Sequence, residues 1–330
     1  MSGSFKSRRT SLAQVAGVAV LVLAAWLGAL LMPTPEGRKP LTVAVGMWPG
    51  AEPFVLARDA GELSREKVNL VEINWSSAAM RAVGNRVVDA TVLSLDEVVR
   101  QVGQGYPLRI VLVTDISRGA DAVVVRPEVG SARDLAGRRV GYEPRTAAAL
   151  MLDRYLASSG LSLPEIQEVP VNPAEVEETF GELTLDAVVL PEPWIQRLRG
   201  LQLKVAYDSA SPGAEVVRVI AVHEQAVKMH REEVGALVRA HLKWMPRLAG
   251  LGAELEPVLR REGVDRATFL AIMAKLEVPS REQNVQWLKG DDSWLLEKMA
   301  AMAKHLRLNG GERHPGFAEM LDASFVTDAL

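Results

Sequence analysis

The chain has 330 residues and contains no cysteine. This absence excludes disulfide bonds, thiolate metal sites, cysteine nucleophiles and lipid anchors attached through cysteine. The chain also has no excess of basic residues, since 38 Lys and Arg stand against 41 Asp and Glu. Nucleic acid is therefore not an expected partner. With 48% hydrophobic residues, the sequence still has enough apolar side chains to bury a sizeable core.

The common catalytic and cofactor-binding motifs are absent as well. The sequence has no GxxxxGK(S/T) phosphate loop, no GxGxxG turn after an expected strand, no HExxH and no GxSxG. Its five histidines show no metal-ligand spacing. We therefore expect no catalytic residues, no metal site and no cofactor, and we do not expect an enzyme.

The first 40 residues differ in charge from the rest of the chain. They carry a net charge of +4, which leaves −7 for residues 41–330. Residues 15–32 are all apolar or glycine, and this run of 18 is near the length needed to cross a bilayer as a helix. Because Lys6, Arg8 and Arg9 precede the run, the positive-inside rule places residues 1–14 in the cytoplasm and the body outside.

Two interpretations of residues 15–32 remain open, a signal anchor and a cleaved signal peptide. A signal peptide has an apolar region of roughly 7–15 residues and a small-x-small cleavage site. Here the run is longer, and no clear triplet of that kind follows Ala25. This favours an uncleaved anchor that tethers the protein to the inner membrane. Residues 33–40, with Pro33 and Pro35, are expected to form a linker that ends the helix.

The body alternates between strand and helix patterns up to residue 222. Short apolar runs at 41–46, 68–74, 87–93 and 108–114 predict strands, and helix-forming segments separate most of them. Alternation at this spacing predicts an α/β fold with parallel strands. Farther along, apolar residues recur at helical spacing and predict helices at 224–250, 254–262, 265–277 and 292–307.

Polar and aromatic residues stand directly after several of the expected strands. In open α/β sheets, ligands bind beyond the carboxyl ends of the strands, where helix N-termini also offer free N–H groups. An ordinary capping role is the alternative for the serines and the threonine. Glu97 stands three residues after Ser94, and this spacing predicts a capping box at the start of the helix that follows. On this placement we expect a ligand site formed by Trp48, Glu52, Ser76, Ser77, Ser94, Asp115, Arg145, Thr146, Glu192 and Trp194.

Four segments together resemble a known family. They are VGMWPGAEPFVLA at 45–57, VDAT with LSLD at 88–96, DLAGRRVG at 134–141, and LDAVV with EPW at 185–194. In order and spacing they resemble the substrate-binding proteins of ABC importers for nitrate, sulfonate, taurine and thiamine-pyrimidine precursors. The resemblance spans roughly residues 41–250, and each motif alone is weak.

The resemblance implies a type II periplasmic binding protein fold, with two α/β lobes that each contain a mostly parallel sheet flanked by helices. Residues 41–117 would form lobe 1, residues 118–206 lobe 2, and residues 207–330 would return to lobe 1 with a helical tail. The family's pocket maps onto Trp48, Ser76 or Ser77, Ser94, Thr146 and Glu192. Arg145 and the Glu143-Pro144 pair depart from the family's usual residues, which leaves the ligand specificity open.

The implied function is extracytoplasmic capture of a small polar organic ligand for an ABC importer. The ligand would be a sulfonate, an amino-pyrimidine or a related anion or zwitterion, and the partner would be an ABC permease in the inner membrane. A membrane-anchored solute sensor is the alternative. An enzyme on the same fold is disfavoured, because its pyrimidine-forming and porphyrin-pathway relatives depend on cysteine. The expected export disfavours a menaquinone-pathway enzyme on this fold.

Overall fold

The computed structural model describes residues 39–329 except for 183, 290–292 and 307–315. The predicted basic head (1–14), the predicted membrane segment (15–32) and most of the predicted linker (33–40) lie outside the described residues. Within the described ranges, the model contains no helix that combines the length and the apolar character needed to cross a membrane.

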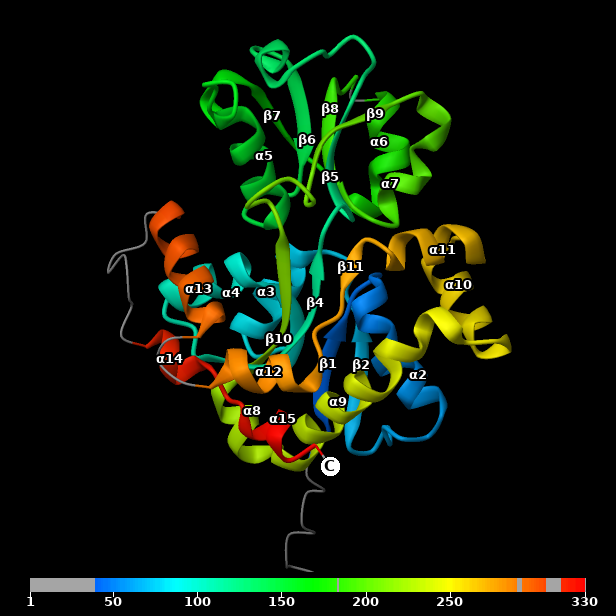
Figure 1. Cartoon of the computed structure of the whole chain (residues 1–330), viewed down its shortest axis with the longest axis vertical. Helices are drawn as coiled ribbons and strands as arrows, with labels where there is room; N and C mark the ends of the chain where they lie inside the picture. The colour runs from blue at the N-terminus through cyan, green and yellow to red at the C-terminus, as the bar shows by residue number, and fades with distance from the viewer. Residues whose placement is uncertain (1–38, 183, 290–292, 307–315, 330) are drawn as a thin grey trace, which may run out of the picture. The chain divides into compact units, whose positions relative to one another are not determined.

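Two β-sheets flanked by helices organise the described chain (Figure 1). We call the part built on the six-stranded sheet lobe 1 (residues 40–117 and 216–329) and the part built on the five-stranded sheet lobe 2 (residues 121–208). The lobe 1 sheet has the order β11-β4-β10-β3-β1-β2, and the lobe 2 sheet has the order β7-β6-β8-β5-β9. This architecture confirms the predicted two-lobed α/β fold. The strands are β1 (Leu41–Val45), β2 (Val68–Glu72), β3 (Ala90–Ser94), β4 (Leu108–Ser117), β5 (Asp121–Val125), β6 (Arg139–Tyr142), β7 (Gln167–Pro170), β8 (Ala187–Pro191), β9 (Lys204–Asp208), β10 (Val216–His223) and β11 (Leu276–Glu277).

Both sheets are mixed rather than mostly parallel. In lobe 1, β1 is parallel to β2 and β3, whereas β10 runs antiparallel to β3 and β4. In lobe 2, β6 is parallel to β7 and β8, whereas β5 runs antiparallel to β8 and β9. The expected parallel pairing assumed a helix between successive strands. It fails at the two connections between the lobes, because β4 leads to β5 and β9 leads to β10 without a helix.

Helices cover the sheets and complete their hydrophobic cores, which in lobe 2 form a separate cluster on each face of the sheet. The lobe 1 core is centred on β4 and β10, whose side chains are buried almost throughout. Since both faces of these strands are covered, they are rich in Val, Leu and Ile. The helices are α2 (Glu52–Asp59), α3 (Ser76–Gly84), α4 (Leu95–Gly103), α5 (Ala147–Ala157), α6 (Val176–Glu182), α7 (Trp194–Arg197), α8 (Glu224–Met229), α9 (Arg231–Trp244), α10 (Glu256–Glu262), α11 (Arg266–Met273), α12 (Arg281–Leu288), α13 (Trp294–His305), α14 (Phe317–Met320) and α15 (Ser324–Thr327).

The segment after β10 packs on lobe 1 but differs in detail from the prediction. The single helix expected at 224–250 is divided at His230 into α8 and α9, and it continues as a 3-10 helix from Met245, next to Pro246. The helix expected at 265–277 ends at Met273, and residues 276–277 instead form β11 at the edge of the sheet. Helix α12 was not predicted. Its Asn284 side chain accepts a hydrogen bond from the N–H of Val113 in β4 and donates one to the C=O of Val113, as a neighbouring strand would. No local sequence pattern indicates this contact.

The two connections between the lobes are joined by a pair of serines. Ser117 Oγ lies 2.7 Å from Ser209 Oγ, and Ser209 Oγ also accepts hydrogen bonds from the N–H groups of Gly119 and Asp121. All of these groups are buried. The predicted boundary after residue 117 coincides with the end of β4, and the predicted boundary after residue 206 falls inside β9.

Candidate ligand-binding site

A cavity of about 110 Å³ lies between the lobes and is lined by both of them. Lobe 1 contributes the loop after β1, the starts of α3 and α4, and Arg218 of β10. Lobe 2 contributes Asp121 at the start of β5, the start of α5 and the end of β8. A cavity of this volume has room for several water molecules or for a small ligand.

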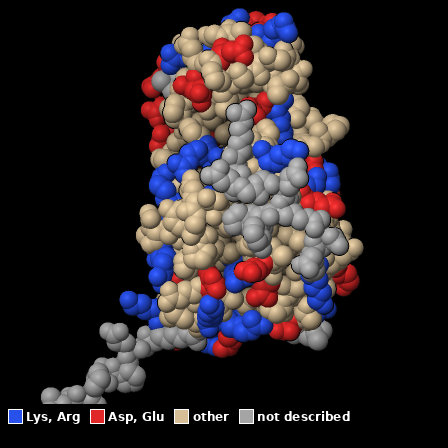
Figure 2. Space-filling model, turned by 90° about the vertical axis from the view of Figure 1, so that its left-hand side faces the viewer, with Lys and Arg blue, Asp and Glu red and all other residues tan. Residues whose placement is uncertain are grey.

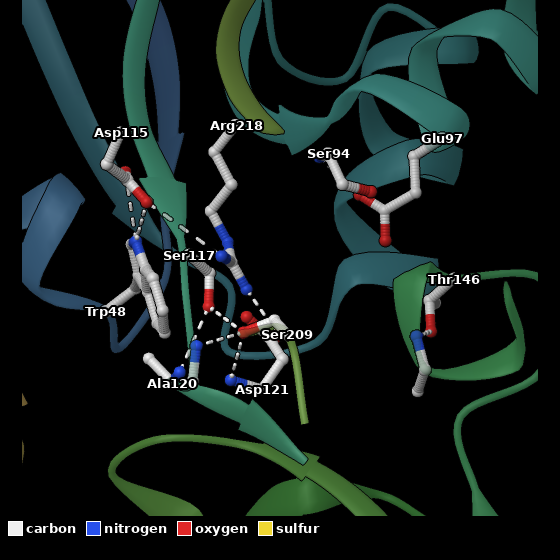
Figure 3. A network of polar contacts seen from close by, with 12 residues as sticks. Trp48, Ser94, Glu97, Asp115, Ser117, Ala120, Asp121, Thr146, Ser209 and Arg218 are labelled. Carbon is white, nitrogen blue, oxygen red and sulfur yellow. Dashed lines mark hydrogen bonds and ion pairs between the residues drawn. The ribbon is translucent and has the colours of Figure 1, made fainter. Parts of the chain in front are cut away.

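Trp48 is fixed at one side of the cavity by a buried carboxylate and a guanidinium (Figure 3). Its Nε1–H lies 3.2 and 3.1 Å from the two carboxylate oxygens of Asp115, and the Arg218 guanidinium lies 3.6 Å from its ring centroid. The glycine at position 50 permits this packing, because a Cβ there would collide with the Asp115 carboxylate. The indole is therefore held in one orientation before any ligand arrives.

Arg218 connects the two lobes by an ion pair. Its guanidinium lies 2.7 Å from Asp121 Oδ1 in lobe 2 and 3.8 Å from Asp115 Oδ1 in lobe 1. Burial raises the pKa of Asp115, while the positive charge of Arg218 acts in the opposite direction. Asp121 keeps its second oxygen, Oδ2, buried and without a hydrogen-bond partner in the described protein.

Glu97 lines the cavity at the start of α4. Its Oε2 accepts a hydrogen bond of 2.9 Å from the backbone N–H of Ser94, as in the predicted capping box. Burial, together with the neighbouring Asp96, raises the pKa of Glu97 to about 8. At neutral pH this carboxyl group is therefore mostly protonated and contributes little charge to the cavity.

On the lobe 2 side, Thr146 and Glu143 line the cavity at the start of α5. The Thr146 hydroxyl donates to the Glu143 carbonyl oxygen at 2.8 Å and accepts from the Ala148 N–H at 3.2 Å, which makes it the N-cap of the helix. The Glu143 carboxylate reaches across to lobe 1, where it accepts a hydrogen bond of 2.8 Å from the N–H of Ser77 in the first turn of α3.

The structure brings half of the predicted site residues to the cavity wall. The predicted residues that line it are Trp48, Ser76, Ser94, Thr146 and Trp194. Asp115 lies behind Trp48, and Ser77 takes part through its backbone N–H bond to Glu143. Arg145 adopts a left-handed backbone conformation with φ of 69° and does not line the cavity.

Glu52 and Glu192 are fully buried in ion pairs away from the cavity wall. Glu52 bonds Arg261 and lies beside Glu262, and burial raises the pKa of both carboxyl groups. Glu192 lies 2.9 Å from the ammonium group of Lys275 and 2.5 Å from the side-chain amide of Gln196. Each carboxylate is paired through its Oε1, whereas its Oε2 is buried without a hydrogen-bond partner among the described residues.

Four charged cavity residues were not among the predicted ones, namely Glu97, Asp121, Glu143 and Arg218. Glu97 had a sequence signal, because it closes the capping box that starts at Ser94. Asp121 and Arg218 had no sequence signal, because each lies at the start of a strand or within one and only the fold brings them to the cavity.

The family profile described as "NMT1/THI5 like" matches residues 53–245, more than half of the chain. The chain belongs to the NMT1/THI5-like family. This membership confirms the resemblance that the four sequence motifs indicated. A search of curated protein sequences found no match.

Solved structures share the fold of this NMT1/THI5-like chain at low sequence identity. The alkanesulfonate-binding protein SsuA from Xanthomonas axonopodis pv. citri, bound to MOPS, is 17% identical with a TM-score of 0.65 over 88% of this chain and 98% of its own. The aliphatic sulphonate binding protein SsuA from Escherichia coli is 14% identical with a TM-score of 0.65, over 83% and 95%. A zinc-bound ligand-binding component of an ABC-type import system from Staphylococcus aureus is 12% identical with a TM-score of 0.69, over 89% and 99%.

In the described part of this chain, no group of His, Asp or Glu is arranged to hold a metal ion.

Proposed function

We propose that the protein is the extracytoplasmic solute-binding component of an ABC importer and that it closes its two lobes around a small polar organic ligand. The observation that carries the proposal is the cavity whose wall is shared by lobe 1 and lobe 2. Binding in such a place stabilises the closed arrangement, because the ligand contacts both lobes only when they meet. We propose no catalytic step.

Two indoles supply the apolar part of the proposed binding surface. Trp48 is held by Asp115 and Arg218, and Trp194 is covered by the guanidinium of Arg197 at 4.4 Å from its ring centroid. Both rings line the cavity. A planar heterocycle such as an amino-pyrimidine, or the aliphatic part of a zwitterion, would pack against such faces. A sulfonate is the other ligand class that the family relationship suggests.

The direct experiment is native mass spectrometry of protein purified without dialysis, which should show a small molecule released on denaturation. A thermal-shift screen of amino-pyrimidines, amines, sulfonates and nitrate should then identify the class that raises the melting temperature. If no retained mass is detected and no compound in the screen shifts the melting temperature, the proposed function is wrong.

Trp48→Ala is expected to weaken binding of the retained ligand by about ten-fold or more, which is about 1.4 kcal/mol. The change removes the ring that both Asp115 and Arg218 hold at the cavity wall. Trp48→Phe keeps a ring but loses the hydrogen bond to Asp115, so its loss should be smaller. Isothermal titration calorimetry measures both. Equal affinity in the wild type and in Trp48→Ala would place the ligand elsewhere.

We further propose that residues 15–32 tether the protein to the inner membrane and that an ABC permease is its partner. On the face shown in Figure 2, Lys and Arg side chains lie beside Asp and Glu side chains around its visible part. Mass spectrometry of the mature N-terminus tests the tether. An intact N-terminal region is expected, and a mature chain that starts at or after residue 30 would contradict the anchor.

A further inference from the structure

Three helices begin at the cavity, and at each N-terminus a side chain of the protein itself accepts a hydrogen bond from one backbone N–H. They are α3, α4 and α5. Helix N-termini attract anions through their free N–H groups and the helix dipole. Here Thr146 caps α5, and the Glu97 carboxyl group bonds the Ser94 N–H at the start of α4. At α3, the occupant is the Glu143 carboxylate from the opposite lobe.

The positive charge at the cavity is also occupied. Arg218 is the one Lys or Arg among the described residues that line the cavity, and it is paired with Asp121 and Asp115. An incoming anion would therefore meet a guanidinium whose charge is balanced by two buried carboxylates, although its Nη1 has no hydrogen-bond partner among the described residues. Meanwhile Asp121 Oδ2, buried and without a hydrogen-bond partner, is an acceptor that a ligand N–H group would satisfy.

On the basis of the proposed function, we infer that Glu143 is a specificity residue that excludes anionic ligands, so that the site selects neutral or cationic molecules bearing N–H donors. Glu143 is about 92% buried, and its carboxylate lies where an anion would bind the first turn of α3. When the lobes separate, the N–H groups of α3 become accessible to an anion. Closing the lobes over that anion would bring the Glu143 carboxylate against a like charge, so closure and anion binding at α3 exclude each other.

The test is titration calorimetry with methanesulfonate and nitrate, which are bare anions that carry no N–H donor. The wild type is expected to bind both more weakly than about 1 mM. Glu143→Ala removes the carboxylate that accepts the Ser77 N–H in the first turn of α3. This variant should bind methanesulfonate at least about ten-fold more tightly than the wild type. Glu143→Gln should gain affinity less than Glu143→Ala, because it removes the like charge while its amide oxygen still accepts the Ser77 N–H. Loss of the contact between the lobes in Glu143→Ala also favours the open form, and Glu143→Gln, which removes the charge but keeps the contact, separates the two effects.

Glu178→Gln is the matched control, because it removes one exposed carboxylate from the same lobe away from the cavity. Its affinity for methanesulfonate should equal that of the wild type. Glu143→Ser provides a second variant that vacates α3, and circular dichroism establishes that each variant is folded. Micromolar binding of methanesulfonate by the wild type would overturn the inference whatever the variants do. So would the absence of any gain in folded Glu143→Ala and Glu143→Ser.

The two proposals fail differently. If the wild type binds an anion tightly and Trp48→Ala weakens that binding, the protein still captures a solute but Glu143 does not exclude anions. If compounds of every charge class fail to bind, the solute-binding function itself is wrong.

Discussion

Arg218→Met is expected to destabilise the protein by about 3 kcal/mol or more, because it leaves two buried carboxylates without their cation. Asp115 is fully buried, Asp121 is 6% exposed, and both lie within ion-pair distance of the Arg218 guanidinium. Methionine keeps an apolar stem against the Trp48 ring but supplies no charge. Thermal unfolding at pH 7 should show a fall of several degrees in the melting temperature.

Arg109→Met is the control for this prediction. Arg109 lies on the neighbouring strand β4, but its ion pair with Glu224 is partly exposed, with side-chain exposures of 28% and 33%. Solvent screens such a pair, so its loss should cost about 1 kcal/mol or less. Adding Asp115→Asn and Asp121→Asn to Arg218→Met should recover much of the loss, because the buried charges are then removed together. An effect of Arg218→Met no larger than that of Arg109→Met would show that the cluster contributes little to stability.

The second large effect is a dependence of stability on pH that originates at Glu97. Burial raises the pKa of Glu97 in the folded protein to about 8, against an ordinary value of 4.5 for the free side chain. Between these values the folded state binds more protons than the unfolded state, so the stability that Glu97 contributes falls as the pH rises through this range. The groups that set this environment are Asp96, Glu143 and Arg218.

Glu97→Gln should remove this dependence. The amide oxygen can still accept the Ser94 N–H, and it carries no charge at any pH. The variant should match the wild type near pH 5 and exceed it by at least about 2 kcal/mol near pH 9, since each pKa unit corresponds to about 1.4 kcal/mol. Melting temperatures measured across this pH range test the prediction. Glu178→Gln, which removes an exposed carboxylate, should keep the wild-type slope. Parallel curves for Glu97→Gln and the wild type would mean that Glu97 is ionised in the folded state.

The local sequence was enough to predict much of the fold and part of the site. Apolar runs bounded by turn residues predicted the strands, and the Ser94–Glu97 spacing predicted the cap that begins α4. Trp48, Ser76, Ser94, Thr146 and Trp194 were expected at the cavity because each follows a strand, and each lines it. These features depend on residues that are close together in the chain, where side-chain type and spacing carry the information.

The sequence alone therefore determined the two-lobed α/β fold, the family and the loops that line the cavity. Only the tertiary structure decided which charges those loops present. The Arg218–Asp121 pair joins residues 97 positions apart, and the Glu143–Ser77 contact joins residues 66 positions apart across the two lobes. The tertiary structure also places Glu52 and Glu192 away from the cavity wall, where they form ion pairs with Arg261 and Lys275. Such pairings depend on where separate strands end in space, and because no local spacing encodes that, the charge balance of the cavity became visible only in the folded chain.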